Sequence, residues 1–455
     1  SKIIIMKPNV LFITIDSLRY DKIFDSKKSS LIPNINKLMK NGISFTQTIS
    51  SADVTGTSLG SLFTSSFPFR SGITLFTPDS ETNTFFKILN DNGYNVYTLF
   101  PDSAFFLTIT KNLKENDPYA YNKRENWIQL FGGLGNRIID KLDNKLSEPW
   151  VYYMHLMDLH VPFTIPAEFD LEKFGKTNHD RMISAIDFWI GKFLEKINLN
   201  NTLIVISSDH GDYDLHRTNP VSHPKGNSIL KFGKKLFPFL EPLIVKFYFA
   251  YQNLKIKKEL NLLKNTHTER EMAALSGRGS KHLFDETIRI PLIFSGYGID
   301  SNKKINQMVR QVDIFPTIAH ILEIPFDANS IDGQSLLPLI SNNDLDELPT
   351  YVETGSKYIK NTPNPKVNGK IIGIRTSKYK YWRSRNDPGK NVALYDLIND
   401  PLEEKNIASE NNSLVIKMEK ILQDLKKGSV EIIRKQFSKD EEKIIEDELK
   451  KLGYI

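Results

Sequence analysis

The sequence predicts an α/β protein: a largely parallel sheet covered by helices on both faces, followed by a small antiparallel sheet with a helix at the C-terminal end. Strand and helix patterns alternate over most of the first 350 residues. Continuous apolar runs at 10–15 and 202–208 are typical of strands buried on both faces. After about residue 345 the pattern changes, and residues 371–385 alternate apolar and polar side chains. This order of patterns favours helices packed on both sides of one sheet.

Each element is justified by its own periodicity and its bounding residues. The helix at 32–42 is expected to stop at Gly42, and the helix at 180–197 is long and amphipathic. The remaining helices are expected at 58–67, 83–93 and 311–322, and strands at 10–15, 94–100, 150–157, 202–208 and 288–296. Strands at 371–385 and 392–401 precede two charged helical stretches. We therefore predict a catalytic domain at 1–350, a small α+β subdomain at 351–430 and a helical tail at 431–455.

Composition narrows the classes of function. The 455 residues carry 60 Lys and Arg against 54 Asp and Glu, a net charge of only +6, and no arginine-rich block. Nucleic acid is therefore not an expected partner. The chain has no cysteine, which excludes disulfides and thiolate sites. No signal peptide or membrane-spanning run is seen, so we expect a cytoplasmic protein.

Residues 217–280 are predicted to be an insertion. Within 225–264, nine lysines and two glutamates are mixed with many aromatic residues. One interpretation is a surface lid that packs on the domain or pairs two subunits as a homodimer. The other is a basic amphipathic element at the surface of an anionic membrane, which would hold the enzyme near a lipid- or glycan-linked substrate.

Polar residues end two of the buried strands. Asp16 follows the first strand directly, and Asp209 and His210 follow the strand at 202–208. Because the carboxyl ends of parallel strands share one edge of a sheet, these side chains are expected to meet there. Two carboxylates and one imidazole suit one divalent metal ion, with Mn²⁺ or Zn²⁺ favoured and Mg²⁺ or Ca²⁺ also allowed.

A hydroxyl is expected beside this metal. Thr55 lies in a turn of small residues, and Gly56 permits that turn to be strained. The helix that follows points its free N–H groups back at the turn, which favours a bound anion. We therefore predict that Thr55 is both nucleophile and metal ligand, and that Gly56 contacts the group being transferred.

These residues carry a resemblance to a known family. PNVLFITIDSLR, LIPNINKLMKNGISF, SLGSLFTSSFPFRSGI, VISSDHGDYDLH, KHLFDETIRIPLIFSG, IDGQSLLPLI and ALYDLINDPLEEKNIA occur in the same order as the matching motifs of sulfatases. The chain thus resembles the sulfatase branch of the alkaline phosphatase superfamily over nearly its whole length. That resemblance implies the fold predicted above and a metal-dependent esterase.

The departures from the family bear on the chemistry. Sulfatases need Cys or Ser, converted to formylglycine, in the motif C/S-x-P-S-R, whereas these positions run from Thr55 to Leu59. Threonine cannot become formylglycine, and the arginine of the motif is missing. Ser17 stands where calcium-binding sulfatases have a second aspartate. A set of Asp, Thr, Asp and His resembles instead the phosphodiesterases, phosphoethanolamine transferases and phosphoglycerol transferases of the superfamily.

The resemblance implies roles for further polar residues. His160 matches a histidine that contacts the transferred group or its leaving oxygen. Lys281 or His282 matches a substrate-binding lysine or histidine of the family. His216 matches the histidine that follows the family's DHGE motif, which here reads DHGD. Asp158 and His160 do not have the D-x-x-x-H spacing of the family's second metal set, so a single metal ion is expected, and His155 and Asp158 are expected to support its ligands.

The predicted function is a metal-dependent phosphodiesterase or phosphotransferase that works through Thr55. The first alternative is a sulfuric ester hydrolase that works without formylglycine. The second is a catalytically inactive binding module, disfavoured because the ligand residues are all present. The expected partner is a phosphate- or sulfate-ester substrate.

Overall fold

The fold is taken from a computed structural model, which describes residues 7–74, 83–113, 115–120, 129–160, 163–213, 258, 263, 266–274, 278–279, 281–299, 302–355, 357–358, 366–367 and 371–427. Most of the insertion at 217–280, including nearly all of 225–264, and the tail at 431–455 lie outside these residues. The lipid contact and the pairing of subunits through 225–264 therefore stay predictions. No described helix is long and apolar enough to cross a membrane.

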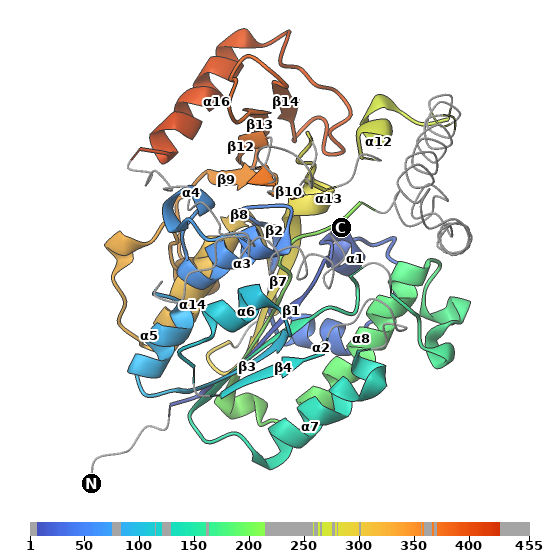
Figure 1. The fold of residues 1–455 in the computed structure, drawn as a ribbon, viewed down its shortest axis with the longest axis vertical. Helices are drawn as coiled ribbons and strands as arrows, with labels where there is room; N and C mark the ends of the chain where they lie inside the picture. The colour runs from blue at the N-terminus through green and yellow to red at the C-terminus, as the bar shows by residue number, and fades with distance from the viewer. Residues whose placement is uncertain are drawn as a thin grey trace, which may run out of the picture.

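An eight-stranded sheet forms the centre of the molecule, in the order β4-β3-β5-β1-β6-β7-β2-β8 (Figure 1). Its strands are β1 (Asn9–Ile15), β2 (Gly42–Ile49), β3 (Asn95–Pro101), β4 (Glu115–Tyr119), β5 (Trp150–Leu156), β6 (Thr202–Ser207), β7 (Arg289–Gly296) and β8 (Lys303–Arg310). β1 is paired in parallel with both β5 and β6. The two strands that carry the predicted metal ligands are therefore neighbours, with their carboxyl ends at the same edge.

β7 runs against its neighbours. It pairs antiparallel with β6 and with β2, although the rest of the sheet is parallel. The register places Ser207, the last residue of β6, opposite Leu292 near the start of β7. The chain thus leaves the sheet and re-enters it at the same edge, so the returning strand must run in the opposite direction. This edge is also where Asp209 and His210 lie.

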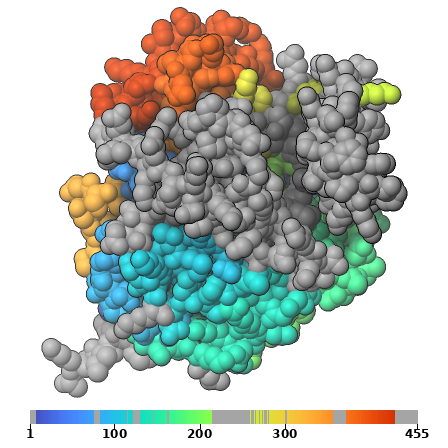
Figure 2. All heavy atoms as spheres, viewed as in Figure 1, coloured from blue at the N-terminus to red at the C-terminus, as the bar shows by residue number. Residues whose placement is uncertain are grey.

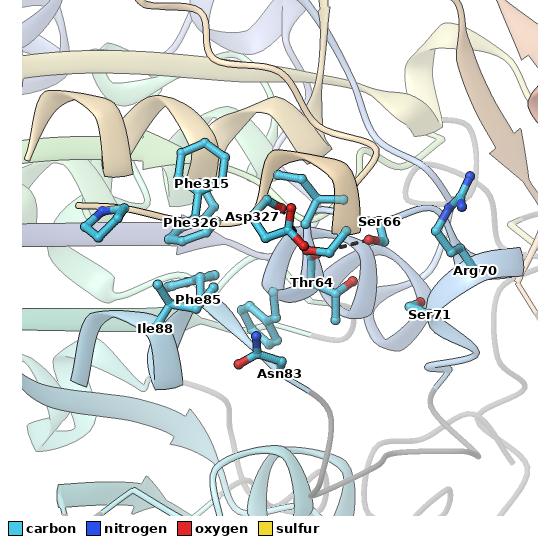
Figure 3. Close-up of a pocket in the computed structure, with 14 residues that line it drawn as sticks. Thr64, Ser66, Arg70, Ser71, Asn83, Phe85, Ile88, Phe315, Phe326 and Asp327 are labelled. Atoms are coloured by element: carbon cyan, nitrogen blue, oxygen red, sulfur yellow. Dashed lines mark hydrogen bonds between the residues drawn. The ribbon is translucent and has the colours of Figure 1, made fainter. Parts of the chain in front are cut away.

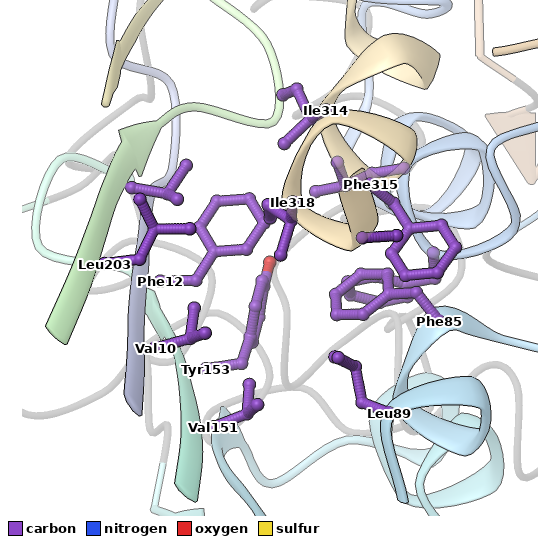
Figure 4. Close-up of a cluster of buried hydrophobic side chains, with 14 of the residues drawn as sticks. Val10, Phe12, Phe85, Leu89, Val151, Tyr153, Leu203, Ile314, Phe315 and Ile318 are labelled. Carbon is purple, nitrogen blue, oxygen red and sulfur yellow. The ribbon is translucent and has the colours of Figure 1, made fainter. Parts of the chain in front are cut away.

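Helices cover both faces of the sheet, as the sequence predicts. On one face lie α3 (Thr55–Thr64), α5 (Phe85–Asp91), α6 (Ala104–Ile109) and α14 (Ile314–Ile321); on the other lie α2 (Pro33–Lys40), α7 (Gly135–Asn144) and α8 (Asn178–Leu194). Figure 4 shows the core under the first group, where Phe12 and Tyr153 from the sheet meet Phe85 and Phe315 from the helices. The ring centroids of Phe85 and Phe315 are 5.4 Å apart.

The shorter elements complete the main domain. They are α1 (Asp21–Phe24), α4 (Pro68–Ser71), a π-helical turn at Leu130–Leu134, α12 (Glu269–Ala274), α13 (Asp285–Ile288) and α15 (Leu337–Ile340). Single 3-10 turns lie at Ala167–Phe169, Glu172–Phe174, Leu199–Asn201, Gln311–Asp313 and Ala328–Ser330. Asp187 of α8 accepts hydrogen bonds from the backbone N–H groups of Asn34 and Ile35, which caps the start of α2.

A second, four-stranded antiparallel sheet follows the main domain, in the order β14-β13-β12-β9. It consists of β9 (Thr350–Glu353), β12 (Ile371–Arg375), β13 (Tyr379–Ser384) and β14 (Ala393–Asp396), packed against α16 (Asn412–Leu425); β10 (Lys357–Tyr358) and β11 (Lys366–Val367) form a separate pair. This subdomain covers one end of the molecule (Figure 2).

A buried charge cluster joins the subdomain to the main domain. The ammonium of Lys380, which is fully buried, contacts the carboxylates of both Asp285 and Glu403, the latter at 2.6 Å. Arg375 Nη2 lies 3.0 Å from Asp285 Oδ2. Burial alone would raise the pKa of Asp285, but Arg375 and Lys380 hold it below its usual value. Two buried cations and two buried carboxylates thus balance one another across the domain boundary.

Lys380→Met should destabilise the protein strongly. It removes the cation between two buried carboxylates, and breaking a buried ion pair from one side costs about 3–5 kcal/mol of the free energy of unfolding. Urea denaturation measures the effect. Lys405→Met is the matched control, because Lys405 is 66% exposed in its pair with Glu410 and should leave the midpoint nearly unchanged. Equal shifts in both variants would contradict the role given to Lys380.

Most predicted elements are confirmed, and the corrections are local. β2, β4 and β8 were not predicted, because their sequences mix polar residues with apolar ones. α3 begins at Thr55 itself, three residues earlier than predicted, and Gly56 lies within its first turn. The prediction of a strained turn at Gly56 is therefore wrong, because the φ of Gly56 is not positive. Ser17, the residue after Asp16, does have a positive φ, of 60°.

Candidate active site

Asp16, Asp209 and His210 meet at the carboxyl edge of the main sheet, as their positions after β1 and β6 predict. One ligand atom from each lies within 4.8 Å of the others, and all three side chains are fully buried. Each strand delivers its polar residue directly after a buried apolar run. The cost of burying two carboxylates is large unless a cation accompanies them.

Thr55 brings a hydroxyl to the same point from α3. Its Oγ1 lies 3.1 Å from Asp16 Oδ2 and 3.2 Å from His210 Nε2. Val54, the residue before the helix, has extended backbone, and no side chain of the described residues caps the helix N-terminus. The first turn of α3 therefore presents its N–H groups and the positive end of the helix dipole on the side of Thr55.

These four side chains fit a divalent metal ion. Asp209 Oδ2 is buried and makes no hydrogen bond with the described residues, yet it lies 3.2 Å from His210 Nε2. Atoms bound about 2.0–2.1 Å from a four-coordinate ion lie roughly 3.3 Å from one another. The separations here are of that size, and the donor set of carboxylates, imidazole and hydroxyl suits a borderline ion.

Ser17 orients both carboxylates through its left-handed backbone. Its hydroxyl donates to Asp16 Oδ1 at 2.6 Å, and its N–H donates to Asp209 Oδ1 at 3.1 Å. The other oxygen of each carboxylate is thereby left to face the group of ligand atoms. A positive φ in a serine is uncommon and often marks a functional turn. Ser17 thus supports the ligands rather than adding a third carboxylate.

The charged groups at the site shift one another's pKa values. Burial alone would raise the pKa of Asp16, but His160, His210, His155 and Arg278 lower it below its usual value. Burial and the neighbouring Asp16 raise the pKa of Asp209 well above its usual value. Burial and Arg278 hold the pKa of His210 well below its usual value, so its ring is neutral, as a metal ligand must be.

Arg278 is the cation nearest to these ligands among the described residues. Its Nη1 lies 2.7 Å from His210 Nε2 and 3.1 Å from His210 Nδ1, and its Nε lies 3.2 Å from Asp212 Oδ1. His210 Nδ1 lies 2.7 Å from the carbonyl of Gly211, which assigns the proton to Nδ1 and the lone pair to Nε2. Arg278 belongs to no motif that was assigned a role from the sequence, although its two flanking glycines in SGRGS mark a turn.

Asp53 ties distant segments to the turn before Thr55. Its carboxylate accepts from the N–H of Gly279 at 2.6 Å and from the N–H of Gly355 at 2.7 Å. A Cβ on Gly355 would lie only 2.0 Å from a methyl of Val54, so this close approach requires glycine. The C-terminal subdomain therefore packs directly against the residues that precede Thr55. Nothing in the local sequence around Asp53 indicates these partners.

Gln311 and Ser58 hold α3 against the end of β6. Ser58 Oγ donates to the carbonyl of Asp209 at 2.5 Å, and Gln311 Nε2 donates to the same carbonyl at 3.0 Å. Gln311 Oε1 lies 2.9 Å from Ser58 Oγ. These contacts fix the start of α3 relative to the residues that follow β6. Gln311 was predicted only as part of a helix, because its contacts are far apart in sequence.

The other predicted residues differ in how close they lie to the ligand atoms. His160 is buried, and among the neighbouring charges it lowers the pKa of Asp16 the most, so its ring lies near the site. Lys281 is exposed, while the ring of His282 stacks on Phe284 at 5.6 Å. Among the described residues, no hydrogen bond or ion pair joins either side chain to the ligand atoms. His216 lies outside the described residues, and these roles stay predictions.

His155 and Asp158 are buried close by. His155 Nε2 lies 3.8 Å from Asp16 Oδ2, and burial lowers the pKa of His155 to about 4. Burial raises the pKa of Asp158 to about 7, and its Oδ1 accepts from the N–H of Leu130. Neither belongs to the three-residue group of possible metal ligands, and their supporting role stays a prediction.

A cavity of about 380 Å³ lies at the opposite end of α3 (Figure 3). Phe85 and Phe315 line its apolar side, and Thr64, Ser66 and Arg70 line its polar side. Because Thr64 is the last residue of α3 and Thr55 the first, this cavity is separate from the metal ligands.

Comparison with known families identifies the fold. The family description "Sulfatase" matches residues 8–324, and "N-sulphoglucosamine sulphohydrolase, C-terminal" matches residues 279–430. The chain belongs to the sulfatase family. The resemblance drawn from the sequence motifs is therefore confirmed, and so is the predicted fold class, whereas the role of threonine in place of formylglycine stays a prediction.

Individual sulfatase relatives are distant. Arylsulfatase K of Gallus gallus is 23% identical over 62% of this chain, and that of Mus musculus is 21% identical over 74%. The alignments span only 52% and 57% of these two relatives. Among solved structures, the phosphonate monoester hydrolase of Agrobacterium radiobacter has a TM-score of 0.66 at 15% identity and covers 93% of this chain and 96% of its own. Ps i-CgsB in complex with k-i-k-neocarrahexaose has a TM-score of 0.64 at 17% identity and covers 98% and 99%.

Proposed function

We propose that this sulfatase-family protein is a metal-dependent hydrolase or transferase of phosphoric esters with Thr55 as nucleophile. The observation that carries the proposal is the threonine hydroxyl within 3.2 Å of both an Asp16 oxygen and His210 Nε2, at the start of α3. A threonine cannot supply the aldehyde hydrate of formylglycine. It can accept a phosphoryl group as an ester, which water or an acceptor alcohol then removes.

The chain's own residues give each part of the reaction a candidate. Thr55 Oγ1 gives up its proton to solvent and forms a bond to phosphorus while the bond to the leaving oxygen breaks, and the protonated ring of His160 gives a proton to that oxygen. The N-terminal turn of α3 and the guanidinium of Arg278 offset charge on the non-bridging oxygens. A divalent ion held by Asp16, Thr55, Asp209 and His210 would lower the pKa of the threonine hydroxyl.

A sulfuric ester hydrolase that works through Thr55 is the second candidate. The two relatives described above are named arylsulfatase K, which favours this alternative over a phosphodiesterase. The solved structures include both a phosphonate monoester hydrolase and a complex with neocarrahexaose. The same nucleophile, metal ligands and helix N-terminus serve either substrate, because phosphoryl and sulfuryl groups are both tetrahedral anions with a leaving oxygen.

A panel of chromogenic esters decides between the candidates. We expect the purified protein, reconstituted with Mn²⁺ or Zn²⁺, to give a higher kcat/KM with bis-p-nitrophenyl phosphate or p-nitrophenyl phosphate than with p-nitrophenyl sulfate. Thr55→Ala, purified in parallel, measures hydrolysis by contaminating enzymes. A preference for the sulfate ester would overturn the leading proposal in favour of the second. Failure to bind metal or to hydrolyse any of the three would indicate the inactive binding module.

A further inference from the structure

A buried histidine stands beside the metal ligand Asp16 on the neighbouring strand. β1 and β5 are paired in parallel with Thr14 opposite His155. Because side chains two residues apart in a strand point to the same face, Asp16 lies on the face that carries Thr14. His155 and Tyr153 of β5 lie on that same face, as their contacts with Thr14 show. An imidazole with no exposed surface is unusual in the apolar run of β5.

The ring of His155 is held in one orientation. Thr14 Oγ1 lies 2.9 Å from His155 Nδ1 and 2.7 Å from the hydroxyl of Tyr153. The ring of Phe106 packs at 5.4 Å from that of His155. Figure 4 shows Tyr153 standing in the core cluster with its hydroxyl pointing along the direction of the strands. The three polar groups therefore form a line that leads from the core toward the carboxyl edge.

The other nitrogen of His155 faces the ligand. His155 Nε2 makes no hydrogen bond with the described residues and lies 3.8 Å from Asp16 Oδ2. Asp16 Oδ1 already accepts from Ser17, and Oδ2 accepts from Thr55 at 3.1 Å. A buried N–H without an acceptor is costly, and the Asp16 carboxylate is the acceptor that this nitrogen faces.

We propose that Tyr153, Thr14 and His155 form a relay that positions Asp16 for metal binding, an inference that rests on the metal site of the proposed function. Tyr153 donates to Thr14, and Thr14 donates to His155 Nδ1. The neutral ring then carries its proton on Nε2, directed at Asp16 Oδ2.

The opposite arrangement is disfavoured by its electrostatics. If Thr14 donated to the carbonyl of Met154, which lies 3.2 Å away, the proton of His155 would sit on Nδ1. The lone pair of Nε2 would then face a carboxylate. The relay avoids this repulsion and fixes the carboxylate plane, so that the remaining lone pair of Oδ2 points at the other ligands. His155 is therefore a positioning residue, since it acts through Asp16.

Metal affinity tests the relay without relying on catalysis. Isothermal titration of the chelator-treated protein with Mn²⁺ or Zn²⁺ gives the Kd. We expect Thr14→Val and His155→Phe each to raise the Kd by about 10–100-fold, which is typical when a residue that orients a metal ligand is lost. The double variant should bind no more weakly than His155→Phe alone, because both changes interrupt one relay. His155→Gln, which retains an N–H donor, should recover part of the loss.

Thr48→Val is the matched control. Thr48 is a fully buried threonine of β2 whose hydroxyl makes no hydrogen bond with the described residues, so its replacement should leave the Kd unchanged. A Kd for folded Thr14→Val within about twofold of the unmodified protein would overturn the relay, even if His155→Phe does not fold. Absence of metal binding in the unmodified protein would overturn the metal site and the relay together. The two failures are therefore distinguishable.

Discussion

Thr55→Ala should lose at least about a thousandfold in kcat with whichever ester the protein hydrolyses, because the reaction loses its nucleophile. The fold should be kept, since Thr55 begins α3 and alanine is an excellent helix former. Initial rates with the p-nitrophenyl esters, with circular dichroism as a check on folding, measure the effect.

Two matched variants sharpen this result. Thr55→Ser keeps a hydroxyl at the same position and should retain much of the activity. Thr64→Ala removes a hydroxyl from the last turn of the same helix, where it donates to the carbonyl of Gly60, and should leave kcat nearly unchanged. Turnover by Thr55→Ala close to that of the unmodified protein would exclude a covalent intermediate on this residue.

Asp209→Asn should abolish tight metal binding and, with it, turnover. Asp209 Oδ2 makes no hydrogen bond with the described residues and faces the other ligand atoms. Losing a charged ligand should raise the Kd by more than the 10–100-fold that is typical when a residue hydrogen-bonded to a ligand is lost. Titration calorimetry and metal analysis of the purified variant measure this. Asp187→Asn, which alters a buried carboxylate that caps α2, should leave the affinity unchanged.

Asp209→Asn should lower the stability of the metal-bound protein but not that of the metal-free protein. Without a cation, burial and the neighbouring Asp16 raise the pKa of Asp209 and disfavour its ionised form, so replacing it by a neutral amide should be neutral or stabilising. With saturating metal, the unmodified protein should be the more stable of the two, because binding stabilises the folded state. Melting temperatures with and without chelator test this crossing, and the same order in both conditions would argue against the metal site.

Sequence patterns alone determined the main features of this protein. Buried apolar runs that end in Asp16 and in Asp209 and His210 predicted two parallel strands with polar residues at one edge, and the structure makes those strands direct neighbours. Thr55 was predicted beside them because it lies in a run of small residues directly before a predicted helix, and both features can be recognised in the local sequence. These inferences worked because strand burial and helix starts depend on residues close together in the chain.

The tertiary structure alone decided the surroundings of the site. Arg278, Gly355 and Gln311 reach it from segments far apart in sequence, so no local pattern predicts their contacts with His210, Asp53 and Ser58. The lone histidine in the apolar run of β5 was visible in the sequence, but the pairing of β5 with β1 is what sets His155 beside Thr14 and Asp16. The polar strands β2 and β8 were missed because the paired sheet, not their own composition, determines their conformation. Local sequence thus fixes which residues end a strand or begin a helix, whereas strand order and direction decide which of them meet.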